Sequence, residues 1–153
     1  MMSALEMARR AAESLVERLG ARVVAVALFG SVARGEASWR SDIDLFVVVK
    51  DLPGGLERRF RIYDAAYEPI KGDVTVIDVD EGDLFREDLR VTPLLLNVAW
   101  DGAILHDPTG RLTKLFNRIR EMVKKAGLER YRTPDGAYGW RPKGARPLGL
   151  IEV

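Results

Sequence analysis

The 153-residue chain contains no cysteine, no glutamine and a single histidine. Without cysteine it forms no disulfide and offers no thiolate to a metal, which is typical of a protein from a reducing compartment. No apolar run approaches the roughly 20 residues that span a bilayer, and the N-terminus lacks the pattern of a secretory signal. A formal net charge of +1 gives no global attraction to nucleic acid or to a membrane. These absences predict a cytoplasmic protein without membrane contact.

Hydrophobic residues make up 47% of the chain and charged residues 31%, as in a folded globular protein. Ser3 with Glu6, and Thr92 with Pro93, have the pattern of helix N-termini. We expect helices over 5–19, 56–70, 94–100 and 109–126, a short acidic helix over 81–90, and strands over 22–28, 45–49, 73–79 and 103–105. This order predicts an α/β (α+β) fold with a mixed sheet of four or five strands and helices mainly on one face.

The most informative stretch runs from residue 28 to residue 49, where two aspartates open an apolar strand. Alternate side chains of a strand share a face, so Asp42 and Asp44 point the same way. Two like charges beside an apolar run cost free energy unless a cation lies between them. Gly30 and Ser31, where the preceding strand ends, supply a backbone without Cβ and a hydroxyl that a phosphate can approach closely. The stretch therefore predicts metal-binding carboxylates that face a phosphate site.

These residues carry a resemblance to a known family. Gly30 and Ser31, ten intervening residues, and then Asp42 and Asp44 match the GS-x10-D-x-D signature of the DNA polymerase β-like nucleotidyltransferase superfamily. Each half of the signature is common alone, but here both occur at the correct spacing, with an apolar strand on either side. The chain resembles the minimal, stand-alone members of the superfamily over roughly residues 5 to 107.

The resemblance implies a metal-dependent nucleotidyltransferase and a role for each residue of the signature. Asp42 and Asp44 would bind two Mg²⁺ ions, while Gly30 and Ser31 would hold the outgoing phosphates of a nucleoside triphosphate, with ATP expected. In the superfamily a third acidic residue opens the neighbouring strand, a position that Asp73 matches. It would complete the metal site and take the proton of the acceptor hydroxyl, which attacks the α-phosphoryl group and releases pyrophosphate.

Two other acidic residues follow on the same expected strand. Asp78 and Asp80 lie about 17 Å or more along an extended strand from Asp73, at a rise of about 3.3 Å per residue, so they cannot share its site. We therefore interpret Asp78 and Asp80 as strand-end and helix-capping residues.

The loop after the first strand also has the glycine spacing of a Walker A motif. Gly30 and Gly35 have that spacing, but Glu36 and Ala37 stand where the motif requires Lys and Ser or Thr. We therefore reject a P-loop.

Four further residues of this region and beyond have open roles. Arg34 and Arg40 are candidates to bind the triphosphate, because guanidinium groups pair with phosphate oxygens in bidentate fashion, or they are solvated loop charges. Trp39 either stacks on a base or holds the loop in place. His106, the single histidine, follows the expected last strand, and we interpret it as structural because metal-assisted phosphoryl transfer does not require a histidine.

The composition changes after Gly127, so we divide the chain into a nucleotidyltransferase domain, residues 1–127, and a basic extension rich in Gly, Pro and aromatic residues, 128–153. Basic residues interleaved with aromatics bind single-stranded nucleic acid through phosphate attraction and base stacking. They also make an ordinary tail that wraps its own domain or a partner, and we prefer this second interpretation.

Three functions compete for this sequence. In the first, the enzyme transfers a nucleoside monophosphate, AMP from ATP, to a hydroxyl. Among small relatives the acceptor is often a tyrosine of a HEPN-type partner, so the resemblance implies an antitoxin. A chain without a large second substrate domain favours a partner protein as the acceptor. In the second, the fold is a binding module that neutralises a partner by contact. In the third, which rests on the tail, it is an RNA end-transferase. Self-association into a homo-oligomer is also open.

Overall fold

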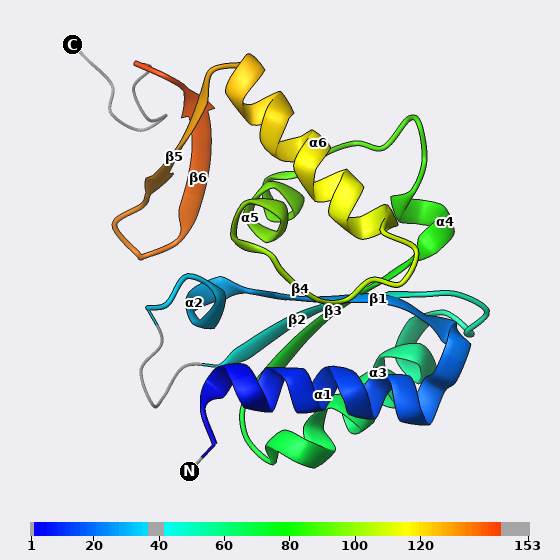
Figure 1. Cartoon of the computed structure of the whole chain (residues 1–153). Coiled ribbons are helices and arrows are strands. Elements are labelled where there is room, and N and C mark those ends of the chain that lie inside the picture. Colours follow the sequence, from blue (N-terminus) through cyan, green and yellow to red (C-terminus); the bar gives the residue numbers. More distant parts are fainter. Residues whose placement is uncertain (1, 37–41, 145–153) are drawn as a thin grey trace.

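A computed structural model describes residues 2–36 and 42–144 of the chain (Figure 1). Its elements in chain order are α1 (Ala4–Leu19), the 3₁₀ turn η1 (Gly20–Arg22), β1 (Val23–Phe29), α2 (Gly30–Ala33), β2 (Ile43–Val49), α3 (Gly55–Ile70), β3 (Val74–Asp80), α4 (Glu81–Leu84), α5 (Pro93–Asp101), β4 (Ala103–His106), α6 (Arg111–Lys125), β5 (Leu128–Arg132) and β6 (Tyr138–Pro142). In the described ranges, no helix has the length and apolar character needed to cross a membrane.

The central sheet has four strands in the order β3-β2-β1-β4. β1 pairs antiparallel with both β2 and β4, whereas β2 and β3 run parallel. A parallel pair needs a crossover connection, and α3 provides it between β2 and β3. The mixed α/β fold and the strand number expected from the sequence are therefore confirmed.

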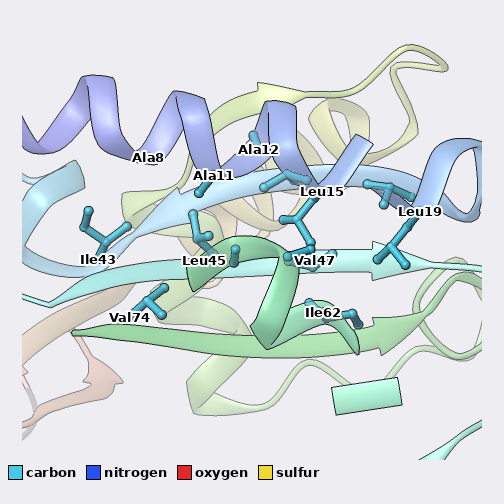
Figure 2. Close-up of a cluster of buried hydrophobic side chains, with 14 of the residues drawn as sticks. Ala8, Ala11, Ala12, Leu15, Leu19, Ile43, Leu45, Val47, Ile62 and Val74 are labelled. Atoms are coloured by element: carbon cyan, nitrogen blue, oxygen red, sulfur yellow. The ribbon is translucent and has the colours of Figure 1, made fainter. Parts of the chain in front are cut away.

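One face of the sheet is covered by α1 and α3 (Figure 1). Figure 2 shows the small and branched side chains of α1, from Ala8 to Leu19, against Leu45 and Val47 of β2 and Ile62 of α3. Three alanines of α1 are buried here, at Ala8, Ala11 and Ala12, so the helix backbone approaches the sheet closely. This cluster holds α1 and the crossover helix on the same face.

The expectation that the helices lie mainly on one face was wrong. α5 and α6 pack on the opposite face, where Phe46 of β2 meets Phe116 of α6 with ring centroids 6.3 Å apart. The physical reason lies in β1 and β2, whose residues are apolar at nearly every position, so that their two faces both require cover.

Two local expectations also differ from the structure. The acidic helix expected over 81–90 is only the single turn α4, because this segment has Gly82 and few apolar residues at helical spacing. The stretch 30–41, expected to be a loop, begins with one helical turn, α2, while residues 37–41 lie outside the described residues.

The first part of the C-terminal extension forms an antiparallel hairpin, β5–β6, which the sequence analysis did not predict. Trp140 of β6 donates a hydrogen bond from Nε1 to Asn97 Oδ1 at 2.9 Å and meets Trp100 edge to face at 5.7 Å. Residues 128–144 thus pack on α5 of their own domain, in agreement with the wrapping interpretation, and the rest of the tail lies outside the described residues.

Candidate active site

The candidate site begins where β1 turns into α2. Phe29, the last residue of β1, pairs with Asp44, the second residue of β2. The next residue, Gly30, has a φ of 76° and lies so close to Asp44 that a Cβ built on it would overlap a carboxylate oxygen. Only glycine satisfies both the positive φ and this close approach. The sequence prediction that Gly30 and the aspartates lie together is thus visible in the structure for Asp44.

The parallel register of β2 and β3 determines which side chain lies beside Asp44. Asp44 pairs with Thr75, and the residues before this pair are Ile43 and Val74, which face the opposite layer in the core cluster under α1. Asp44 and Thr75 therefore share the face that carries the site. The Thr75 hydroxyl hydrogen-bonds the Asp44 carboxylate. Sequence reasoning missed Thr75, because its role depends on a register that the sequence does not encode locally.

The electrostatics of Asp44 reflect burial and a neighbouring like charge. Burial raises the pKa of this half-buried carboxyl, and the charge of Asp42 raises it further. The hydrogen bond from Thr75 and the positive charge of Arg34 act in the opposite direction, but the pKa remains above its ordinary value. A carboxylate in this state gains stability from an added cation.

Asp73, the predicted third carboxylate, directly precedes β3 and is exposed. Its carbonyl accepts a hydrogen bond from the Ile43 amide at 3.1 Å, which places Asp73 near the start of β2. Among residues 2–36 and 42–144, however, no three His, Cys, Asp or Glu side chains gather as a metal-binding group. The role of Asp73 as a ligand therefore stays a prediction.

Arg34, a predicted phosphate ligand, is held by two carboxylates. Its Nε donates to Glu36 at 3.1 Å and one terminal nitrogen donates to Asp101 at 3.0 Å. Although burial lowers the pKa of Arg34, these hydrogen bonds outweigh it and raise the pKa, so the guanidinium stays charged beside the site. Ser31 forms part of α2 next to Gly30, whereas Arg40 and Trp39 lie outside the described residues.

The β5–β6 hairpin of the C-terminal extension also contacts the Arg34–Asp101 pair. Arg130 of β5 donates two hydrogen bonds to Asp101, each 2.9 Å long. The ring of Tyr138 lies 4.9 Å from the Arg34 guanidinium and 4.2 Å from that of Arg130, within the range of cation–π attraction. Asp101, Arg130 and Tyr138 are residues that sequence reasoning missed. Asp101 is 67 positions from Arg34 and 29 from Arg130, beyond the reach of any periodicity argument.

The remaining candidates lie away from the site. Asp78 is buried under α3, where it binds Arg58 at 2.6 Å, and Asp80 caps α4 by accepting the Gly82 amide at 2.8 Å. Both positions agree with the structural interpretation made from the sequence. His106 ends β4 and pairs with Val26.

A mixed sheet with the D-x-D pair at the start of one strand, against a Gly-Ser turn that ends its neighbour, defines the class of nucleotidyltransferase-fold proteins. Comparison with protein families gives the same answer, because the model described as "Nucleotidyltransferase domain" matches residues 8–96. The chain belongs to this family. The match includes Gly30, Ser31 and all three predicted aspartates, and it ends before the hairpin.

Individual relatives support the assignment. A protein of Methanocaldococcus jannaschii named "Putative protein adenylyltransferase MJ1305" is 28% identical over 113 residues, which cover 71% of this chain and 76% of the relative. Among solved structures, a toxin–antitoxin crystallised with AMP-PNP aligns with a TM-score of 0.54 at 17% identity, over 76% of this chain and 87% of that chain. The tri-AMPylated HEPN toxin of Shewanella oneidensis in complex with its MNT antitoxin aligns with a TM-score of 0.50 at 18% identity, over 80% and 88%. At these identities the structural matches show a shared fold.

Proposed function

We propose that the chain transfers AMP from ATP to a hydroxyl group and releases pyrophosphate. The observation that carries the proposal is the close approach of Gly30 to Asp44, the second residue of β2, with Asp42 immediately before that strand. The family supports a nucleotidyltransferase, the name of the relative from M. jannaschii supports an adenylyl group, and AMP-PNP accompanies one structural neighbour.

The acidic pair fits a divalent cation. Asp42 raises the pKa of Asp44, so the two carboxylates repel each other, and an all-oxygen donor set suits Mg²⁺. Asp42 and Asp44 would hold the metal, two ions in the arrangement expected from the sequence, with Asp73 as the expected third ligand. When bound, Mg²⁺ would neutralise phosphate charge and polarise the α-phosphoryl group.

The chain's own residues would then position the nucleotide. Because Gly30 has no Cβ, the phosphates can approach the backbone at Gly30 and Ser31 directly. Arg34, fixed by Glu36 through Nε and by Asp101 through one terminal nitrogen, has further N–H donors for a phosphate oxygen. The acceptor oxygen forms a bond to the α-phosphorus, the bond to the bridging oxygen breaks, and pyrophosphate leaves with those electrons. Asp73 is placed in the proposal as the group that takes the hydroxyl proton.

The acceptor in this proposal is a tyrosine hydroxyl of a HEPN-type partner, so that the chain acts as an antitoxin. The support is the tri-AMPylated HEPN toxin bound to an MNT antitoxin of the same fold. An RNA acceptor receives less support, because Arg130 and Trp140 of the basic extension are engaged in contacts within the chain.

The test is incubation with Mg²⁺ and ATP labelled at the α-phosphate, with the product of a neighbouring gene as the candidate partner, with RNA, or alone. We expect label on the partner, and none with Asp44→Asn or Asp42→Asn. Asp88→Asn is the matched control and should retain transfer, because Asp88 is an exposed acidic residue that pairs with Arg86 on the surface. A tight complex without label would support the binding module instead, and label on RNA alone would support the end-transferase.

A further inference from the structure

The outer side of α3 carries a stripe of large apolar side chains that the described chain leaves uncovered. Its members are Leu56, Phe60, Tyr63 and Tyr67, which we call the α3 stripe, and they are 70%, 69%, 40% and 39% exposed. Their spacing of four, three and four residues places them along one line of the helix. This is the spacing of a helix–helix seam, in which each apolar residue inserts between residues of a facing helix.

The stripe has both a projection and a recess. Beside it lies a cavity of about 220 Å³ lined by Leu56, Arg59, Phe60, Tyr63 and Val76 of the neighbouring strand β3. A two-fold contact requires that one surface carry both complementary shapes, because the same patch meets itself. Phe60, with most of its ring exposed, and the recess next to it satisfy that requirement.

The charges along α3 define the direction of pairing. The N-terminal half, 55–62, has three arginines and one glutamate, whereas the C-terminal half, 63–70, has Asp64 and Glu68 and no basic residue. Arg58 is bound to Asp78 at 2.6 Å, and Arg59, whose side chain is 67% exposed, approaches the same carboxylate only at 3.5 Å. In the C-terminal half Asp64 pairs with Arg18 at the surface. The outward charge is therefore carried mainly by Arg59 and Arg61 in one half and by Glu68 in the other. Two copies of α3 in antiparallel orientation bring the positive half of each against the negative half of the other, and their helix dipoles also align favourably. A parallel pair would bring like charges together.

We infer that the α3 stripe is the interface of a two-fold homodimer in which two α3 helices pack antiparallel, with Phe60 of each copy next to Tyr63 of the second copy. Four side chains of this size supply roughly half of the about 800 Å² per partner found in standard interfaces. The dimer is therefore expected to be reversible and concentration-dependent. The inference does not depend on the proposed transfer activity.

The first test measures the mass of the full chain by analytical ultracentrifugation from micromolar to near-millimolar concentration. We expect the average mass to rise toward twice the 17.1 kDa of the chain, and the rise to weaken at high salt. Phe60→Asp should raise the dissociation constant at least about tenfold. Leu94→Asp is the matched control, since Leu94 is an exposed leucine of α5 on the other side of the sheet, and it should leave the mass curve unchanged.

The second test determines the relative orientation of the two α3 helices. Because the native chain has no cysteine, any disulfide must form between the introduced residues. We expect a mixture of the Phe60→Cys and Tyr63→Cys variants to form a disulfide on oxidation much faster than either variant alone. Rapid linkage of Phe60→Cys to itself would overturn the antiparallel arrangement. A wild-type chain that remains monomeric throughout, including one whose stripe binds only a different protein, would overturn the homodimer.

Discussion

Asp101 accepts hydrogen bonds from Arg34 and from Arg130, so one carboxylate joins the turn after β1 to the C-terminal hairpin. All three side chains are largely buried, with exposures of 6% for Asp101, 17% for Arg34 and 14% for Arg130. Arg34 in turn influences the charge of Asp44. A segment beyond the match to the nucleotidyltransferase family is thereby connected to the candidate site.

Asp101→Asn should lower the free energy of unfolding by about 2 to 3 kcal/mol, because it keeps the shape but removes the charge that two buried guanidinium groups share. Urea denaturation measures this change. Asp88→Asn removes a carboxylate from an exposed pair with Arg86 and should stay within about 0.5 kcal/mol of wild type. Equal effects of the two substitutions would show that the Asp101 cluster contributes no more than a surface ion pair.

Gly30→Ala should abolish nucleotide binding while the fold survives. The added methyl group overlaps a carboxylate oxygen of Asp44, so the aspartate must turn away, and the positive φ adds about 1 to 2 kcal/mol of strain. Gly35→Ala provides the control, since its φ of 74° imposes the same strain but no atom of the described residues lies within 4 Å of the new Cβ. Titration calorimetry with ATP, alongside thermal unfolding, separates the two effects. ATP binding by Gly30→Ala that equals binding by Gly35→Ala would contradict the role of this contact.

Features determined by neighbouring residues were predictable from the sequence. Ser3 accepts the Glu6 amide at 3.1 Å and Thr92 accepts the Leu95 amide at 3.2 Å, so the helix starts expected from these patterns are confirmed. Strand positions were predictable for the same reason, because an apolar run is a local signal. The D-x-D pair and the Gly-Ser turn were found through their spacing.

Features determined by register and by distant contacts were not predictable. The strand that begins near Asp73 was expected, but only the pairing of β2 with β3 shows that Thr75 is the residue beside Asp44. Both Arg34 and Arg130 were visible as basic residues, yet nothing local indicates that they share Asp101. Which distant side chains pair depends on how the whole domain packs, and the composition and periodicity of a sequence give no information about that packing.

Asp44→Asn should raise the unfolding temperature at neutral pH in buffer with a metal chelator. The pKa of Asp44 is raised mainly by burial, so the folded state binds a proton more tightly than the unfolded chain does. Ionised Asp44 therefore costs stability, and this cost disappears as the pH falls toward about 4, the value for an unfolded chain. The advantage of the Asn variant should be largest at neutral pH and shrink on acidification.

Thr75→Val is the companion variant for that measurement. It removes the hydrogen bond that favours ionised Asp44, so its destabilisation should be larger at neutral pH than near pH 4. A pH-independent difference from wild type in both variants would mean that Asp44 has no raised pKa in the folded chain.

Thr75→Asp should convert the acidic pair into a tighter cation site. The substitution places another carboxylate in direct register with Asp44 on the adjacent strand. Without metal, the repulsion between the two carboxylates costs stability, whereas with metal the new carboxylate is an additional ligand. A tenfold gain in Mg²⁺ affinity would add about 1.4 kcal/mol of stability at saturating metal, visible as a larger Mg²⁺-induced rise in Tm. Thr75→Asn has the same size without the charge and should show no such gain. If Mg²⁺ stabilises the Asp and Asn variants equally, the cation does not bind at Asp44.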